Sequence, residues 1–316
     1  MELLRLKGVS KEYGSHLVLN NINFCIEEGD VYGIIGQSGS GKSTLLNLIV
    51  GFLEPDEGQV HYYTATGKPK VFKEHAHRIR KRIGFTPQHL SFYPKLTVKE
   101  NLLHFGHIYR IKKNILVDNA KSLLKFTNLL SSRNVLADEL SGGMQKRLDI
   151  ACSLVHKPRL LVMDEPITDL DPLLKADILE LIKEVNRQGV TVIIASHDLE
   201  DVEEICNKVA IIHNGVIHEE GLLEEIRKPY LGKDALISLK AGIHHESLLE
   251  FSKTLPVNKI IDKRTHFLLE TGDSHKTVSE LMSFIQYNNL SLNQVEISQP
   301  SLKTIFESII KESKNK

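Results

Sequence analysis

Residues 36–44 read GQSGSGKST and match the phosphate-binding loop pattern G-x-x-x-x-G-K-[ST]. The run VYGII at residues 31–35 predicts a strand before this loop, and TLLNLIV at residues 44–50 predicts a helix after it. The glycines of the loop lack a Cβ atom, so the backbone can curl its N–H groups around a phosphate. The helix that follows directs its N-terminal dipole at the same anion. A nucleotide-binding site is therefore expected here.

Two side chains of the loop carry specific expectations. Lys42 can reach the β- and γ-phosphates, and the Ser43 hydroxyl can take a position on Mg²⁺. A phosphate loop does not define a reaction by itself, so the chemistry depends on residues further along the chain. The loop residues expected at the nucleotide are Gly36, Ser38, Gly39, Ser40, Gly41, Lys42, Ser43 and Thr44.

Two adjacent carboxylates follow a predicted buried strand. Residues 160–163 are apolar, and Asp164 and Glu165 come next. Ionised groups at that depth need partners or a ligand. Asp164 is suited to hold the hydration shell of Mg²⁺ beside Ser43. Glu165 is then placed to orient or deprotonate the water that attacks the γ-phosphate.

A histidine and a glycine pair complete the candidate chemistry. His197 follows the strand-like run TVIIAS, and a neutral imidazole there can bond the γ-phosphate and hold the attacking water. The run LSGGM at residues 140–144 predicts a second anion-binding helix start. There Ser141 serves as the N-cap and the glycines as flexible backbone, before a helix that is expected from residue 144. An ordinary capped helix is the alternative.

The composition limits the class of protein. The 316 residues suffice for a sizeable core and about two domains. The 40 basic and 40 acidic residues cancel, which argues against nucleic acid as the main partner. Three widely spaced cysteines predict reduced thiols in a cytosolic protein. We expect no secretory segment, and no apolar run reaches the ~20 residues that span a bilayer.

The pattern of the chain changes near Gly232. Before it, strand-like and helix-like runs alternate, as in a parallel sheet with crossover helices. Thr97 and Glu100 predict a capping box. The basic stretch at residues 68–82 predicts a solvated hairpin and helix, with contact to phosphate or lipid headgroups as the alternative. The part downstream reads β-α-β-β-α-β, the ferredoxin-like order, and ends in an amphipathic helix at residues 301–313.

Seven motifs in one order resemble those of the ATP-binding subunits of ABC transporters, over about residues 3–221. GQSGSGKST resembles the Walker A loop, LSGGM the ABC signature, and LLVMDEP the Walker B strand. Gln88 resembles the Q-loop glutamine, which touches Mg²⁺ and the attacking water. TDLD with Asp171 resembles the D-loop, and His197 the switch histidine. Tyr13 resembles the aromatic that stacks on adenine, and a strand-end tyrosine is the alternative reading.

The resemblance implies an α/β fold, namely a P-loop NTPase core with a mixed, largely parallel sheet, flanking helices and a helical subdomain. The expected domains are residues 1–230 for ATP binding, with the helical subdomain at about 89–158, and 231–316 as a small ferredoxin-like α+β accessory domain. ATP and Mg²⁺ are the implied cofactors. The implied catalytic residues are Glu165, His197, Gln88 and Lys42. The implied metal ligands are Ser43, Gln88 and Asp164. The residues implied to bind nucleotide together with the phosphate loop are Tyr13, Ser141, Gly142, Gly143 and Asp171.

The resemblance also implies partners. Two chains are expected to enclose two ATP molecules head to tail, as a homodimer or with a similar chain. Ser141 and Gly143 of one chain then contact the γ-phosphate held by the other. The permease must be a separate transmembrane chain, which places this chain on the cytoplasmic face of the membrane, with no nucleic acid expected. One departure is Met144, where the family usually has glutamine; it puts in doubt only a polar contact to the ribose side.

The end of the chain bears on the direction of transport. The run QPSLKTIFESI resembles the tail of ATPases that serve export permeases for drugs, lipids or polysaccharides. A helix cap followed by a docking helix is the alternative reading of these residues. Export is therefore the favoured function. A lipid-trafficking or import system, or a soluble ABC ATPase without a transport role, is the alternative.

Overall fold

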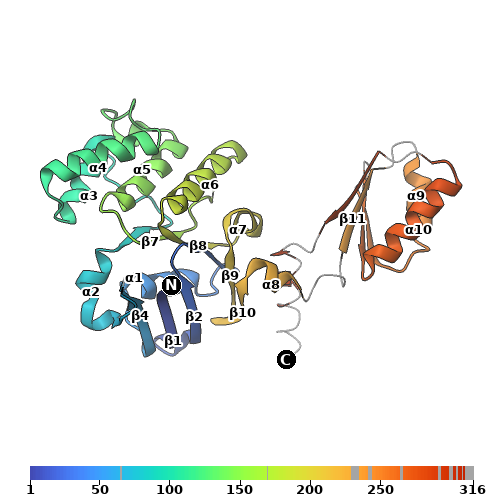
Figure 1. Ribbon diagram of the computed structural model, residues 1–316, viewed down its shortest axis with the longest axis horizontal. Helices are drawn as coiled ribbons and strands as arrows, with labels where there is room; N and C mark the ends of the chain where they lie inside the picture. Colours follow the sequence, from blue (N-terminus) through green and yellow to red (C-terminus); the bar gives the residue numbers. More distant parts are fainter. Residues whose placement is uncertain are drawn as a thin grey trace. The chain divides into compact units, whose positions relative to one another are not determined.

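The computed structural model describes residues 1–64, 66–168, 170–228, 235–240, 244–263, 266–290, 293–298, 302–303, 305–307 and 309. The chain divides into two compact units, Met1–Gly221 and Leu222–Lys316 (Figure 1). Each unit has its own sheet or sheets and its own apolar core. No helix in the described ranges is long and apolar enough to cross a membrane.

A six-stranded sheet forms the centre of the first unit, in the order β10-β9-β3-β8-β7-β6. The strands from β9 to β6 pair in parallel. Every residue of β3, β7 and β8 is buried, because helices and a second sheet cover both faces of a parallel sheet. The bounds are β3 Val31–Ile35, β6 Ile83–Thr86, β7 Leu160–Asp164, β8 Thr191–Ser196, β9 Lys208–His213 and β10 Val216–Leu222.

A second, antiparallel sheet has the order β2-β1-β4-β5. Its strands are β1 Glu2–Tyr13, β2 His16–Glu27, β4 Glu57–Tyr63 and β5 Pro69–Val71. Helix α1 (Lys42–Val50) shares one apolar core with both sheets, so the helix after the phosphate loop is held from two sides. The basic stretch forms β5 and helix α2 (Phe72–Arg80), which confirms the expected hairpin and helix.

A helical region follows β6 and contains α3 (Val98–Ile108), α4 (Lys113–Phe126) and α5 (Gly142–Leu154) around its own core. The capping box between Thr97 and Glu100 is confirmed. Helix α5 begins two residues earlier than expected, at Gly142. Glycine is a poor helix former in a helix interior, but the first turn needs no intrahelical N–H partner and tolerates it.

Helices α6 (Pro172–Arg187) and α7 (Leu199–Ile205) return the chain between strands of the parallel sheet. Helix α6 contacts β8, and α7 contacts both β3 and β8. Each helix starts on an aspartate whose side chain accepts a backbone N–H, Asp171 for α6 and Asp198 for α7. These caps fix the points at which the chain leaves the sheet edge.

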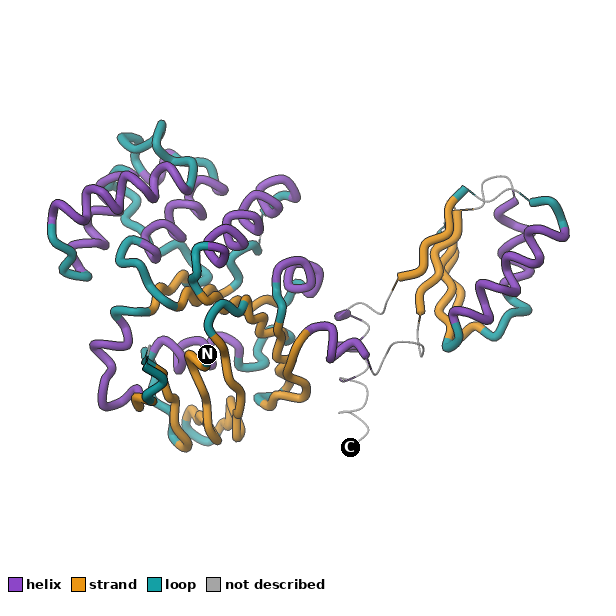
Figure 2. The backbone as a smooth tube through the Cα atoms, in the orientation of Figure 1, coloured by secondary structure: helices purple, strands orange, loops and turns teal. Residues whose placement is uncertain are grey.

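The second unit contains helix α8 (Leu223–Arg227) and a four-stranded antiparallel sheet in the order β12-β13-β11-β14. Two helices lie on one face of this sheet (Figure 2). The expected ferredoxin-like order is therefore confirmed, whereas the final helix predicted at residues 301–313 lies largely outside the described residues. The bounds are β11 Ala235–Lys240, α9 His245–Ser252, β12 Val257–Asp262, β13 Phe267–Thr271, α10 Ser274–Tyr287 and β14 Gln294–Ser298.

Candidate nucleotide-binding site

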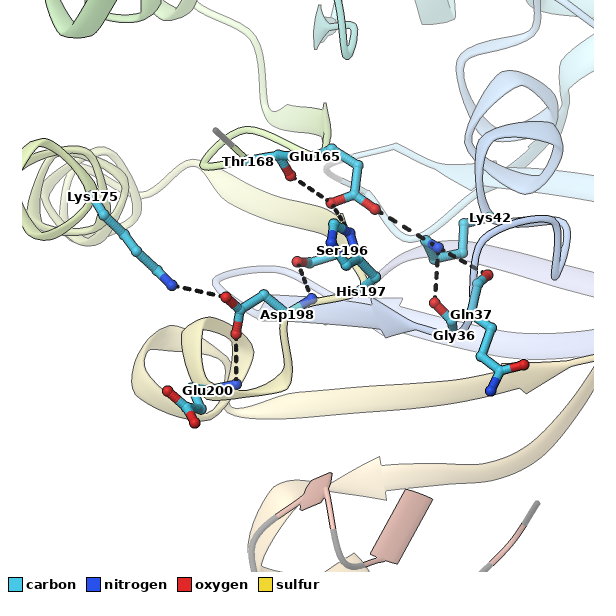
Figure 3. A network of polar contacts seen from close by, with 10 residues as sticks. All are labelled: Gly36, Gln37, Lys42, Glu165, Thr168, Lys175, Ser196, His197, Asp198 and Glu200. Atoms are coloured by element: carbon cyan, nitrogen blue, oxygen red, sulfur yellow. Dashed lines mark hydrogen bonds and ion pairs between the residues drawn. The ribbon is translucent and has the colours of Figure 1, made fainter. Parts of the chain in front are cut away.

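The carboxyl ends of three adjacent parallel strands bring the predicted chemistry to one place. The phosphate loop follows β3, the two carboxylates lie at the end of β7, and His197 follows β8. Figure 3 shows Lys42, Glu165 and His197 directed toward one another. These three side chains border a pocket of about 540 Å³ whose lining is Val18, Ser38, Gly39, Gly41, Lys42, Ser43, Thr44, Gln88, Glu165 and His197.

The loop needs glycine for reasons that the structure makes specific. A Cβ atom on Gly36 would lie 2.4 Å from the carbonyl oxygen of Ile212 and 2.4 Å from Ser40 Oγ. Gly41 has a φ of 105°, in the region that only glycine adopts readily. Ser40 Oγ is buried without a hydrogen-bond partner among the described residues. The backbone is therefore packed closely and the loop curls where an anion can be bound.

Lys42 lies at the floor of the pocket and is only 7% exposed. Its ammonium donates hydrogen bonds to the carbonyl oxygens of Gly36 at 2.8 Å and Gln37 at 3.2 Å. Its Nζ atom also lies 3.7 Å from Oε1 of Glu165 (Figure 3). Burial lowers the pKa of Lys42, and the carboxylates of Glu165 and Asp164 oppose that shift. A buried cation is thus held inside the loop.

Glu165 has an unusual backbone with a consequence for its side chain. Its φ of 50° lies in the left-handed region, which costs a non-glycine residue about 1 kcal/mol or more. The backbone N–H donates to the carbonyl of Ala195 on β8 at 2.9 Å, which stabilises this turn. The carboxylate is buried and faces Lys42, and its Oε2 atom accepts a hydrogen bond from Thr168 Oγ1 at 2.9 Å. Strain of this kind is characteristic of functional positions.

Asp164 is the better candidate for a metal ligand. Burial raises the pKa of its carboxyl group, and the hydrogen bond with Ser43 opposes the shift. Its Oδ1 atom is buried without a partner in the described part of the chain. One carboxylate oxygen beside one hydroxyl suits Mg²⁺, which takes few protein ligands and completes its shell with water and phosphate oxygens. The described ranges hold no cluster of three or more histidine, cysteine or acidic side chains for another metal.

The loop after β8 is fixed by a polar network that the sequence did not reveal. His197 Nδ1 lies 2.9 Å from Glu165 Oε2, and the imidazole remains 56% exposed. The next residue, Asp198, forms an ion pair with Lys175 of α6 at 2.8 Å, and its N–H donates to Ser196 Oγ (Figure 3). Thr168 and Lys175 were not expected to take part in the site. Their contacts depend on the turn after Glu165 and on where α6 packs.

Helix α5 holds the segment beyond Gln88. The carboxylate of Asp149, which is 1% exposed, accepts hydrogen bonds from Ser91 N at 3.0 Å and from Ser91 Oγ at 2.5 Å. Burial raises the pKa of Asp149. The neighbouring Lys146 is buried as well, and the carboxylates of Asp149 and Asp164 oppose the lowering of its pKa by burial. An aspartate within an apolar run was the only signal in the sequence for this link.

Other predicted residues lie outside the pocket of their own chain. Tyr13 ends β1 with 49% of its surface exposed, and Lys11 Nζ lies 5.8 Å from its ring centroid. Ser141 and Gly142 are exposed at the start of α5, and Ser141 makes no side-chain capping bond. Asp171 caps α6 by accepting from two backbone N–H groups at 3.0 Å each. None of these residues lines the 540 Å³ pocket.

Comparisons with known proteins agree with this geometry. Residues 19–168 match the ABC transporter family. The linearmycin resistance ATP-binding protein LnrL of Bacillus subtilis (strain 168) is 30% identical over 307 residues, which are 96% of this chain and 97% of that protein. The Nod factor export ATP-binding protein I of Bradyrhizobium diazoefficiens is 34% identical over 227 residues, 72% of each chain.

Solved structures show the same fold. The ADP conformation of MJ1267, an ATP-binding cassette of an ABC transporter, gives a TM-score of 0.65 at 34% identity and covers 73% of this chain and 95% of its own. The dimeric ATP-binding cassette MJ0796, in a post-hydrolysis state with ADP and Pi, gives 0.61 at 31% identity and covers 70% and 99%. The chain therefore belongs to the ATP-binding proteins of the ABC transporter family, a family of ATP hydrolases.

Proposed function

We propose that this chain binds MgATP in the 540 Å³ pocket and that its hydrolysis powers a separate membrane permease. The observation that carries the proposal is the convergence of Lys42, Glu165 and His197 from three strand ends on the phosphate loop. A cation for the phosphates, a carboxylate for water and an imidazole lie within one network. That set of groups meets the needs of phosphoryl transfer, which depends on positioning and charge stabilisation.

MgATP binding uses the phosphate loop together with Asp164 and Gln88. The N–H groups of residues 36–44 and the Lys42 ammonium contact the phosphates, with the dipole of α1 behind them. Ser43, Asp164 and Gln88 would hold Mg²⁺, and the Oδ1 atom of Asp164, which has no partner among the described residues, supports this assignment. A Mg²⁺ ion held by these residues would supply positive charge that offsets the negative charge of the phosphates.

Hydrolysis follows from the position of Glu165. The carboxylate orients a water molecule and accepts its proton as the water oxygen bonds to the γ-phosphorus. The bond from that phosphorus to the β–γ bridging oxygen breaks, and ADP and inorganic phosphate result. His197 and Thr168 hold the carboxylate through its Oε2 atom. Lys42 stabilises the charge on the phosphate oxygens in the transition state.

A second chain completes the site. Ser141, Gly142 and Gly143 lie at a helix start, where free N–H groups favour an anion, and they do not reach the pocket of their own chain. We therefore assign them to the γ-phosphate held by the partner, in a homodimer or a pair with a similar chain. Tyr13 stacks on adenine and Asp171 belongs to the same interface. The dimer of MJ0796 supports this arrangement.

The names of the relatives support a role in export. LnrL matches over nearly the whole chain and is named for resistance to linearmycin, and the Nod factor relatives are named for export. We propose export of a drug-, lipid- or polysaccharide-type substrate, with the permease holding this chain at the cytoplasmic face of the membrane. Residues 1–230 then form the ATP-binding domain, with the helical subdomain at about 89–158, and residues 231–316 form an accessory domain. The segment between Gln88 and Ser141 docks on the permease.

Two experiments test the hydrolytic activity and the transport role of this chain separately. Purified chain should hydrolyse ATP only with Mg²⁺, and Lys42→Ala should abolish the activity, with Lys68→Ala on the exposed hairpin as the control. Co-expression with a candidate multi-span membrane permease should give a complex whose ATPase responds to the cargo. An active chain that forms no such complex would contradict the transport role but not the hydrolytic site.

A further inference from the structure

The structure assigns a second anion-binding pocket, which we propose takes a phosphate monoester with a small organic body. It has a volume of about 420 Å³ and lies at the starts of β6 and β7, whereas the ATP pocket lies at the ends of β3, β7 and β8. The two pockets share no lining residue. The inference does not depend on the transport function.

Cations from several separate segments line this pocket. Lys70 comes from β5, Arg78 from α2, Lys81 and Arg82 from the turn before β6, and Arg159 from the residue before β7. Arg159 is brought there by the sheet, because its N–H donates to the Arg82 carbonyl at 2.8 Å. The basic stretch of the sequence thus gains a cation that lies 77 residues beyond Arg82 (159 − 82 = 77).

Most of the positive charge of the pocket is uncompensated. No aspartate or glutamate of the described residues lines it. Arg159 pairs with Glu28, but Lys70, Arg78, Lys81 and Arg82 make no ion pair or side-chain hydrogen bond with any residue in the described ranges. Like charges gathered in this way repel one another, and an anion with several oxygens relieves the repulsion through charge-assisted hydrogen bonds.

The remaining wall sets the size and character of the ligand. Leu3, Ile79 and Tyr63 contribute apolar and aromatic surface, and the hydroxyl of Tyr62 is tied to the Ile49 carbonyl, so that ring is fixed. A volume of about 420 Å³ falls in the range of pockets for small organic molecules. A phosphate with an attached organic group fits this combination. The source is either a soluble phosphate ester or the headgroup of a phospholipid.

The experiment uses the full chain saturated with MgADP, so that the ATP pocket is blocked. Glycerol 3-phosphate is titrated calorimetrically, with glycerol as the control that lacks the charge. Vesicles of phosphatidylcholine with and without phosphatidic acid test the lipid source by sedimentation. Binding of glycerol 3-phosphate alone assigns a soluble ester, and binding of phosphatidic acid vesicles alone assigns a headgroup.

The specificity test compares two double variants that each remove two charges from the basic stretch. All four positions are exposed, but Arg78→Gln with Lys81→Gln changes residues that line the pocket, whereas Lys68→Gln with Lys73→Gln changes residues outside its lining. The pocket variant should weaken binding at least about tenfold, and the control variant much less. Both should keep the wild-type ATPase rate, which verifies their fold.

Two results would overturn the proposal. One is the absence of binding to both glycerol 3-phosphate and phosphatidic acid vesicles. The other is an equal loss in the two double variants, which would show general electrostatic attraction in place of a built pocket. Neither result would affect the proposed ATP site, since that site is assayed by hydrolysis.

Discussion

His197 Nδ1 and Glu165 Oε2 lie 2.9 Å apart, so one hydrogen bond joins the residues that follow two adjacent parallel strands. The same oxygen accepts a hydrogen bond from Thr168 Oγ1 at 2.9 Å. The other carboxylate oxygen faces Lys42 at 3.7 Å. The position of the proposed base is therefore set by three side chains from three different segments, and each contact can be removed separately.

Glu165→Gln should lower kcat by about 10²- to 10⁴-fold and leave MgATP binding intact. The amide cannot take a proton from water, but it keeps nearly the same size and shape. Steady-state ATPase rates measure the fall in kcat, and a nucleotide-binding isotherm measures MgATP binding. Light scattering should show an ATP-dependent dimer, because the trapped nucleotide is not hydrolysed. The matched control is Glu180→Gln, an exposed carboxylate of α6 that pairs with Arg187. A variant that hydrolyses ATP at the wild-type rate would rule out Glu165 as the base.

Thr168→Val should reduce kcat several-fold, by about 3- to 10-fold, with little change in KM. The loss of one hydrogen bond to a charged group is worth about 1.5–3 kcal/mol at most, and His197 still holds the carboxylate. Thr168→Ser keeps the hydroxyl and should restore most of the rate. A valine variant with wild-type kcat, or a serine variant as slow as valine, would show that the hydroxyl does not position Glu165.

Gly142→Glu should disturb the ATP site that this residue completes in the partner chain without changing the fold of its own chain. Nothing lies within 4 Å of a Cβ built on Gly142, and a carboxylate at a helix start is favourable. The thermal midpoint should therefore remain unchanged, while ATPase activity and ATP-dependent dimerisation fall by more than about tenfold through repulsion of the triphosphate. The control, Asn114→Glu, adds the same charge to the exposed first turn of α4. Full activity in Gly142→Glu would contradict the head-to-tail dimer.

His156 should make the stability of the protein fall in mild acid. Its ring stacks on Tyr109 at 3.6 Å between centroids and its Nε2 lies 3.0 Å from the Ile83 carbonyl oxygen. Burial lowers the pKa of His156 to about 4, below the value of 6.5 for an exposed histidine. The unfolded chain therefore binds more protons between these pH values. The contribution is complete above about pH 6.5 and is lost as the pH falls toward 4, by about 2 kcal/mol at pH 5.

Urea unfolding at pH 7.5 and pH 5 measures this loss. His156→Phe keeps a ring against Tyr109 but cannot be protonated, so its stability should fall less between the two pH values than that of the wild type. The other histidines are the same in both chains, so their contribution cancels when the two changes in unfolding free energy are subtracted. An identical pH dependence in both chains would show that His156 is not the group responsible.

Much of the fold was predictable because its elements have strong local signals. Strands β3, β7 and β8 are buried on both faces and therefore read as continuous apolar runs. Parallel strands end at the same sheet edge, so residues just after them, such as Glu165 and His197, could be expected to meet. The ferredoxin-like order was likewise visible in the alternation of its segments.

The contacts between segments distant in sequence were not predictable. The φ of 50° at Glu165 depends on a hydrogen bond to β8, and the Thr168 bond depends on the turn that follows. Asp149 could not be linked to Ser91 without the packing of α5 against the segment after β6. Hydrophobic periodicity fixes which face of an element is buried, but not which neighbour covers it.

The sequence by itself determined that this chain carries a phosphate loop, a pair of strand-end carboxylates and a histidine, because each is a local pattern of residue types. Tertiary structure alone decided which residues share a pocket. It placed Lys42 beside Glu165, left Ser141 and Gly142 outside, and brought Arg159 to the basic stretch. The physical reason is that the order of strands in a sheet comes from packing over the whole domain, and a local run of residues does not contain it.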